Sequence, residues 1–232
     1  MADPIAANID HIRERIARAA RRAGRKEESI RLMAVSKTVE PARVRQAVEA
    51  GIRIFGENYV QEAREKIPAL GPGIEWHMIG HLQTNKVKYV VPLFDWIHSV
   101  DRIELAGELD RRAGKLGRTL NILIEVNVGG EASKSGAPPQ DVPALIRDAA
   151  LLPHLRIRGL MTMPPYSENP EDARPYFVSL VKLRDAIRAL AIDNVSMDEL
   201  SMGMTDDFEV AIEEGATIIR VGRAIFGRRP VR

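Results

Sequence analysis

A short apolar run followed by a stretch with helical spacing recurs eight times along this chain, and this alternation limits the possible folds more than any other feature. The apolar runs begin near Ile30, Ile52, Ile74, Phe94, Leu120, Leu155, Val195 and Thr217. Amphipathic helical spacing follows them, as over residues 44–48 and 103–109, and is clearest over residues 176–190. Repeated strand–helix units predict a parallel sheet joined by helical crossovers, and therefore an α/β fold.

The number of units favours a closed barrel over an open sheet. Runs such as residues 31–35 and 122–124 are apolar on both faces, as in parallel strands that are buried on both sides. Eight units in 232 residues fit a (β/α)₈ TIM barrel, which usually takes about 250 residues. An open doubly wound sheet is the alternative, and the lack of G-x-G-x-x-G after the first strand weakens it. Since no Pro/Gly/Ser-rich linker divides the chain, we predict a single domain over residues 1–232.

An extra helix is predicted before the first strand. Pro4 suits the first helical position and Gly24 suits the end. Isoleucines at positions 5, 9, 12 and 16 form an apolar stripe, while arginines occupy the other faces. Those arginines are either a solvated helix surface, which we favour, or an anchoring face for nucleic acid or lipid.

Composition excludes several classes of protein. The chain has 34 Lys plus Arg against 32 Asp plus Glu, so its net charge of +2 does not predict a nucleic-acid partner. With no cysteine, it has neither disulfides nor a thiol nucleophile, which fits a reducing compartment. No apolar run approaches the roughly 18 residues that span a membrane, and no signal core follows Met1. We therefore expect a cytoplasmic protein without membrane or nucleic-acid partners.

Lys37 is the most informative polar residue. It closes the first apolar strand, at the strand end where barrels place their active sites. An ordinary lysine is neutral in only about one molecule in 2,500 at pH 7. Partial desolvation there would favour the neutral amine that a nucleophile requires. Lys37 is thus either a Schiff-base lysine or a lysine that snorkels out of the barrel rim.

The last two strand ends predict a phosphate site. Barrels often bind phosphate with the loops after strands seven and eight and a short extra helix. Ser201 offers a hydroxyl, and Gly203 and Gly222 allow close approach of backbone amides to an anion. The residues after Gly222 resemble one helical turn. The alternative is that both glycines serve only as turn residues.

Arg220 lies inside the apolar run of the eighth strand, where a guanidinium needs an acceptor. Glu125, in the fifth strand, is one candidate acceptor, and a ring nitrogen of a bound ligand is the other. An amine at Lys37, a phosphate cup and this arginine together suggest pyridoxal 5′-phosphate.

Other polar residues are weaker candidates. His77 and His81 are four residues apart but span a strand-to-loop transition, so we expect hydrogen-bonded rim histidines and no metal site. Lys134, in the flexible loop of residues 129–136, is either a second amine near the ligand or a solvated lysine, which we favour.

The sequence resembles the pyridoxal phosphate homeostasis proteins (YggS/PROSC type) from about residue 5 to residue 228. Their fold is similar to the N-terminal barrel of alanine racemase. The matching stretches are residues 34–38, 55–62, 76–86, 159–163, 200–207 and 220–227. Six collinear matches at the family's spacing make this a specific resemblance, and in this family the protein is expected to be a monomer.

The resemblance implies a set of cofactor contacts. Lys37 would carry pyridoxal 5′-phosphate as an internal aldimine, and Arg220 would meet the pyridine nitrogen. Asn58 and Met161 would line the ring. The phosphate would be held by Ser201, Gly222 and residue 223, to which the position of the loop after the seventh strand adds Gly203. Position 223 often has a small hydroxyl residue in this family, whereas Arg223 offers its backbone amide and no hydroxyl. Its guanidinium would either contact the phosphate or face solvent.

Two function classes follow. Because arginine does not give up its proton, a pyridine nitrogen opposite Arg220 stays unprotonated and makes the ring a poorer electron sink. Racemases with a related barrel add a base from a second domain, which we do not expect here. The sequence favours a carrier that buffers or delivers the cofactor, with apo-enzymes as the candidate recipients and no catalytic residue of its own. A small racemase or aldimine-forming lyase is the alternative, and a cofactor-free Schiff-base aldolase is a third reading.

Overall fold

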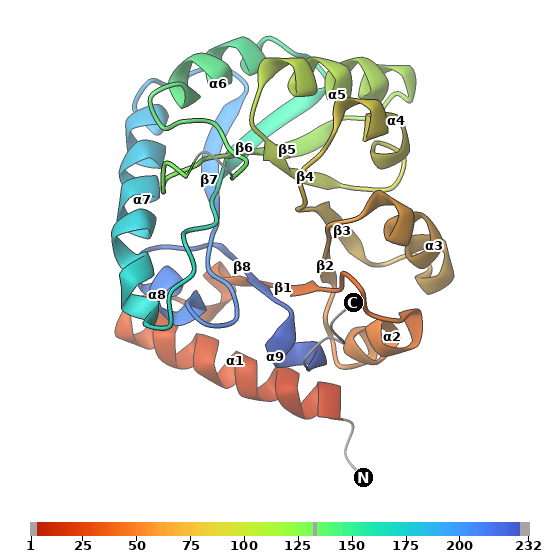
Figure 1. The fold of residues 1–232 in the computed structure, drawn as a ribbon, viewed down its shortest axis with the longest axis vertical. Helices are drawn as coiled ribbons and strands as arrows, with labels where there is room; N and C mark the ends of the chain where they lie inside the picture. Colours follow the sequence, from red (N-terminus) through yellow and green to blue (C-terminus); the bar gives the residue numbers. More distant parts are fainter. Residues whose placement is uncertain (1–3, 132–133, 228–232) are drawn as a thin grey trace.

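Eight parallel strands close into a barrel in the computed structural model, which describes residues 4–131 and 134–227 (Figure 1). Each strand pairs with the next along the chain, and β1 pairs with β8. The strands are β1 (Arg31–Val35), β2 (Ile54–Glu57), β3 (Glu75–Met78), β4 (Trp96–Val100), β5 (Leu120–Glu125), β6 (Leu155–Met161), β7 (Val195–Ser201) and β8 (Ile218–Val221). The predicted TIM barrel is confirmed, and every strand starts within two residues of its predicted position.

Helices surround the barrel and cover the outer face of its strands (Figure 1). They are α2 (Pro41–Glu49), α3 (Val60–Leu70), α4 (Val87–Val90), α5 (Ile103–Lys115), α6 (Val142–Ala150), α7 (Arg174–Arg188), α8 (Phe208–Glu213) and α9 (Arg223–Phe226). Short 3₁₀ turns at Glu27–Ser29, Thr84–Lys86 and Pro170–Ala173 complete the connections. No helix in the described part of the chain combines the length and apolar character needed to cross a membrane.

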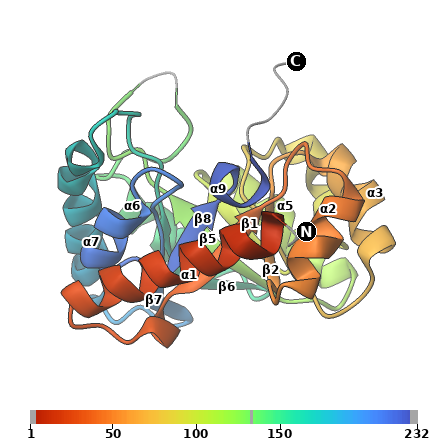
Figure 2. The ribbon, with the colours of Figure 1, turned by 90° about the horizontal axis from the view of Figure 1, so that it is seen from below.

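The extra N-terminal helix α1 (Pro4–Arg22) is also confirmed, and it lies across α8 and α9 (Figure 2). Its predicted isoleucine stripe is buried. Gly24 ends the helix with φ +64°, and the next N–H group, of Arg25, donates to Ala20 O at 2.9 Å. Two arginines are not simply solvated, because Arg15 pairs with Glu209 of α8 at 2.7 Å and Arg22 pairs with the same carboxylate at 3.3 Å.

The alternation of side chains along each strand separates two kinds of core. On β5, Ile122 and Ile124 face the helices and belong to the large apolar core. Leu123 faces the barrel interior, where it packs with Trp96 and Met161. Because successive strand residues point to opposite faces, Glu125 also points inward, at the carboxyl end of the barrel. The interior side chains of the strands therefore lead directly into the mouth of the barrel.

Candidate functional site

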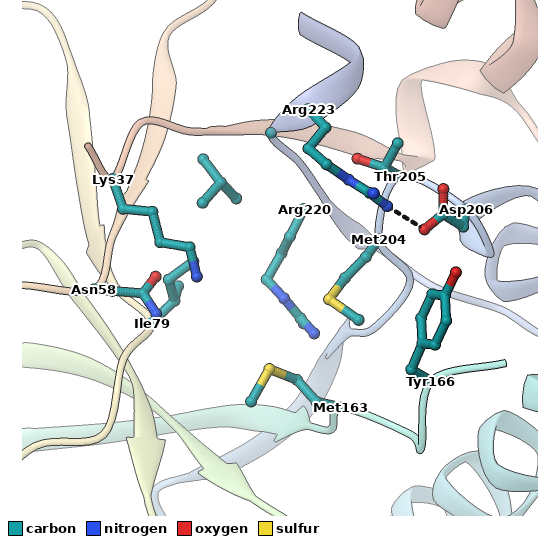
Figure 3. A pocket seen from close by; sticks show the side chains of 12 residues that line it. Lys37, Asn58, Ile79, Met163, Tyr166, Met204, Thr205, Asp206, Arg220 and Arg223 are labelled. Atoms are coloured by element: carbon teal, nitrogen blue, oxygen red, sulfur yellow. Dashed lines mark hydrogen bonds and ion pairs between the residues drawn. The ribbon is translucent and has the colours of Figure 1, made fainter. Parts of the chain in front are cut away.

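A cavity of about 230 Å³ opens at the carboxyl ends of the strands, where TIM barrels carry their active sites (Figure 3). Its lining residues come mainly from β1, β8 and the loops after β2, β3, β6 and β7. They are Val35, Lys37, Asn58, Ile79, Met163, Tyr166, Met204, Thr205, Asp206, Arg220, Gly222 and Arg223. The structure thus brings together five of the eight residues predicted to bind a cofactor.

Lys37 enters the cavity two residues beyond the end of β1. Its side chain is partly buried and extends toward Asn58 and the centre of the cavity, with Arg220 on another wall (Figure 3). The following residue, Thr38, has φ +60°, a left-handed conformation that is uncommon for a non-glycine residue. Its neighbours must therefore hold the backbone in this turn.

A buried ion pair holds the backbone on the N-terminal side of Lys37. The Lys66 ammonium, from α3, donates to the carbonyl oxygen of Ser36 and to Glu57 Oε1, each at 2.7 Å. The Ser36 hydroxyl donates to the same Glu57 oxygen at 2.6 Å. Burial raises the pKa of Glu57, and Lys66 and Ser36 only partly offset that rise.

A second carboxylate holds the C-terminal side. Glu62 Oε2 accepts the backbone N–H of Thr38 at 2.7 Å and lies 3.5 Å from Lys66 Nζ. We call the set Ser36, Glu57, Glu62 and Lys66 the backbone clamp. It fixes both residues that flank Lys37. Sequence reasoning missed it, although the i, i+4 spacing of Glu62 and Lys66 is a recognisable helical ion pair.

Two hydrogen bonds from its guanidinium fix the side chain of Arg220 in place. It is 4% exposed, and its Nη1 donates to Ser201 Oγ at 2.7 Å while Nη2 donates to the carbonyl oxygen of Thr162 at 2.8 Å. Neither bond is to Glu125, the partner that the sequence left open. Burial lowers the pKa of Arg220 to about 10, with Asp207 and Glu125 opposing that shift. The guanidinium therefore stays charged at neutral pH and has further N–H groups to offer to the cavity.

A chain of hydrogen bonds continues from Arg220 through the barrel interior. Ser201 Oγ lies 3.0 Å from His98 Nδ1, and His98 Nε2 lies 2.8 Å from His77 Nδ1. His77 Nε2 lies 2.7 Å from Glu75 Oε1, near the opposite end of the barrel. Burial is the main cause that lowers the pKa of both histidines, so both are neutral. His77 is therefore an interior residue, and its predicted place on the rim is wrong.

The two ends of this chain fix the direction of every proton. The Glu75 carboxylate can only accept, so neutral His77 donates to it through Nε2–H and accepts at Nδ1. His98 therefore carries its proton on Nε2, donates it to His77, and accepts at Nδ1. The Ser201 hydroxyl donates to His98 Nδ1, and its oxygen accepts from Arg220, which can only donate. We assign these tautomers from the bonding pattern, which leaves one consistent arrangement.

Three predicted site residues do not line the cavity. Ser201 is fully buried between Arg220 and His98. Met161 is 1% exposed and packs inside the barrel. Gly203 has φ +86°, and a Cβ there would lie 2.5 Å from Ala211 Cβ, so close packing against α8 accounts for this glycine.

The opposite wall of the cavity is formed by Gly222, Arg223 and Thr205. Gly222 precedes α9, whose first N–H groups have no partner within the helix. The Arg223 guanidinium turns to Asp206, with which it forms an ion pair (Figure 3). Sequence reasoning did not single out Thr205, although it directly follows the loop predicted to bind phosphate.

Lys134 lies outside this lining, in a second space beside the cavity. Its ammonium pairs with Glu131 at 3.0 Å and donates to the carbonyl oxygen of Pro164 at 3.3 Å. Of its loop, residues 132 and 133 lie outside the described residues. His81, which also borders this space, lies 3.0 Å from Ser135 Oγ through its Nδ1.

Residues 7–230 match the family model described as alanine racemase, N-terminal domain. The pyridoxal phosphate homeostasis protein of Aquifex aeolicus is 49% identical over 95% of this chain and 96% of its own length. That of Escherichia coli K12 is 44% identical, with 97% of each chain covered. This chain belongs to that family. The resemblance found in the sequence motifs is therefore confirmed.

Solved structures agree with this assignment. PipY of Synechococcus elongatus, solved with PLP bound, is 37% identical with a TM-score of 0.85, and the match covers 96% of this chain and all of that one. Alanine racemase of Corynebacterium glutamicum has a TM-score of 0.70 at 18% identity, covering 99% of this chain and 61% of that one. The latter likeness shows that the barrel fold is shared.

Proposed function

We propose that this protein binds pyridoxal 5′-phosphate covalently through Lys37 and takes part in cofactor homeostasis as a buffer or carrier. The observation that carries the proposal is the meeting of Lys37 and Arg220 in one small cavity at the carboxyl end of the barrel. Membership in a family of pyridoxal phosphate homeostasis proteins supports it.

The polar groups of the cavity fit the three chemical ends of this cofactor. Lys37 would supply the amine for the aldehyde, and an N–H of Arg220 would donate to the ring nitrogen. Thr205 and the backbone N–H groups after Gly222 would hold the phosphate. Asn58 Oδ1 is buried without a hydrogen-bond partner among the described residues, as expected of a group that awaits a ligand.

The size of the cavity also suits a ligand with one ring. Its 230 Å³ lies below the range of about 300–1,000 Å³ that is usual for drug-sized ligands. Met163 and Met204 provide apolar contacts, and Tyr166 stands at its mouth (Figure 3).

The same residues favour holding over catalysis. When bound, the cofactor supplies an aldehyde that condenses with amines and a ring that can withdraw electrons. Arg220 keeps its protons and so holds the ring nitrogen unprotonated, which weakens that withdrawal. We therefore propose a carrier that has no catalytic reaction of its own, acts as a cytoplasmic monomer, and delivers the cofactor to apo-enzymes.

The test is an absorbance spectrum of the protein with the cofactor, before and after borohydride reduction, followed by peptide mapping. We expect one reduced adduct, on Lys37. Lys37→Ala abolishes the lysine-bound band, whereas Lys182→Ala, on the exposed face of α7, keeps it. A label on another lysine would overturn the assignment. Racemisation of an added amino acid by the wild-type protein would instead establish the enzyme alternative.

A further inference from the structure

A second space adjoins the cavity and shares its wall. We call it the side chamber; it encloses about 270 Å³. It shares Asn58, Ile79, Met163, Tyr166 and Met204 with the cavity, so the two spaces are contiguous. The polar side chains that line only the chamber are His81, Glu125, Lys134 and Ser135.

Glu125 is the unusual member of this lining. It is the last residue of β5, points into the barrel mouth and is 3% exposed. Its Oε2 atom is buried and has no hydrogen-bond partner among the described residues. Leaving a buried carboxylate oxygen unbonded costs about 1–3 kcal/mol or more. This orphaned acceptor, beside a space large enough for a ligand, indicates a site for a donor.

The charges around Glu125 define which donor fits. Burial, followed by the nearby Asp101 carboxylate, raises the pKa of Glu125 to about 7, and Arg220 partly opposes them. His81 and Lys134 line the same chamber, where the Lys134 ammonium pairs with Glu131 at 3.0 Å. The pKa of Glu125 thus lies well above its usual value, and an added positive charge nearby would favour the anionic form.

We propose that the side chamber binds the ammonium group of a small primary amine, with Glu125 as its anionic partner. This inference deepens the proposed carrier function and rests on it, because an amine is the chemical group that can compete with Lys37 for an aldehyde. The Lys134 ammonium in the same lining is already paired with Glu131, and the described residues contain no cluster of three or more side chains that could hold a metal ion.

The first test uses the wild-type protein without cofactor. Its glutamates carry a ¹³C label at the carboxyl carbon, and Glu125 is titrated by NMR between pH 5 and pH 9. We expect propylammonium chloride at saturation to lower the apparent pKa of Glu125 by at least one unit. Potassium chloride at equal ionic strength leaves it unchanged. Equal titration in both salts would overturn the proposal, and this test needs no variant to fold.

The second test compares Glu125→Gln with Glu49→Gln, an exposed carboxylate on α2. We expect propylammonium to bind at least tenfold more weakly to Glu125→Gln, and with unchanged affinity to Glu49→Gln. Unchanged binding to Glu125→Gln would overturn the proposal.

Borohydride trapping of the cofactor on Lys37 separates this inference from the carrier proposal. We expect both variants to be labelled like the wild-type protein. Normal labelling with unaltered propylammonium binding in Glu125→Gln would leave the carrier function and remove the ammonium site. A wild-type protein that binds propylammonium through Glu125 but is never labelled would keep the ammonium site and remove the carrier function.

Discussion

Two walls of the cavity present a cation each, and they hold it in different ways. On the β1 wall, the backbone clamp bonds the residues before and after Lys37, and the neighbouring interior side chains Met33 and Val35 are apolar. On the β8 wall, the Arg220 guanidinium itself is bonded, to Ser201 and to a backbone carbonyl.

This difference matches what the proposed function would require of each cation. A lysine that makes and breaks a covalent bond must move its terminal nitrogen, so rigidity belongs in its backbone. An arginine that donates a hydrogen bond to a ring nitrogen benefits from a fixed side chain, since a preorganised donor needs no reorganisation when the ligand binds. The structure thus predicts that damage to the two walls has different consequences, which the following variants test in order of expected effect.

Lys66→Met should have the largest effect, because it removes the cation of the backbone clamp. Breaking a buried ion pair leaves an uncompensated charge on Glu57 and typically costs about 3–5 kcal/mol. We expect a loss of this size in the free energy of unfolding in urea. Slower borohydride trapping at Lys37 should accompany it, because the Ser36 carbonyl loses its donor.

The double variant Lys66→Met, Glu57→Leu is the matched rescue, since it removes both charges. It should recover most of the stability but not the trapping rate. Lys182→Met, on the surface of α7, is the neutral control. A loss below 1 kcal/mol in the single variant would show that the clamp does not hold the β1 wall.

Glu125→Gln should change how the free energy of unfolding depends on pH. Glu125 is one of the two carboxylates that act electrostatically on Arg220. The pKa of this carboxyl rises from its usual 4.5 to about 7, chiefly through burial, and each pKa unit corresponds to about 1.4 kcal/mol. The folded wild-type protein keeps this proton longer than the unfolded chain does. Its stability therefore falls as the pH rises from about 4.5 to 7, by up to about 3 kcal/mol.

The variant loses this dependence, so its free energy of unfolding relative to the wild-type protein should be higher at pH 8 than at pH 5. Urea unfolding at pH 5 and at pH 8 measures this change, with Glu49→Gln as control. A stability difference between variant and wild type that is the same at both pH values would contradict the raised pKa.

The β8 wall also shows where sequence reasoning ends. Strand positions follow from apolar runs and helices from their spacing, so the barrel and the places of Lys37, Asn58 and Arg220 could be predicted. The bond between Ser201 and His98 joins residues 103 positions apart and depends on barrel closure. No local pattern contains it.

The facing of strand residues was a second limit. Parallel strands that are apolar on both sides do not reveal which alternate residues point inward. His77 was expected at the rim because it was placed at the end of the third strand, whereas it lies within β3 and is fully buried. Similarly, the sequence could not show that Gly203 packs against α8 or that Thr205 borders the cavity.

Ser201→Ala should have a moderate effect that falls on the β8 wall alone. It deprives Arg220 Nη1 of an acceptor and His98 Nδ1 of a donor, at a cost of about 1–3 kcal/mol. We expect roughly tenfold weaker cofactor binding in an absorbance titration, which equals about 1.4 kcal/mol. Lys37 should still be the residue that borohydride labels.

Ser99→Ala is the control. Ser99 follows His98 in β4, and its buried hydroxyl has no hydrogen-bond partner among the described residues. It should leave cofactor affinity unchanged. Equal losses in the two variants would mean that any small cavity near the histidines has the same effect, and that the hydrogen bond to Arg220 is not what matters.

Arg223→Ser should have the smallest effect, and it separates two ways of holding a phosphate. The Arg223 guanidinium is half exposed and already paired with Asp206, and exposed pairs contribute about 0–1 kcal/mol. If the backbone N–H of residue 223 holds the phosphate, the variant keeps that donor, and affinity changes less than threefold at 50 mM and 200 mM salt. If the guanidinium leaves Asp206 to hold it, affinity falls at least tenfold and loses part of its salt dependence. An absorbance titration of the cofactor at the two salt concentrations decides between them. The first result would place the fixed donors of the β8 wall in its backbone as well as in Arg220. The second would make Arg223 a third cation of the cavity, mobile like Lys37.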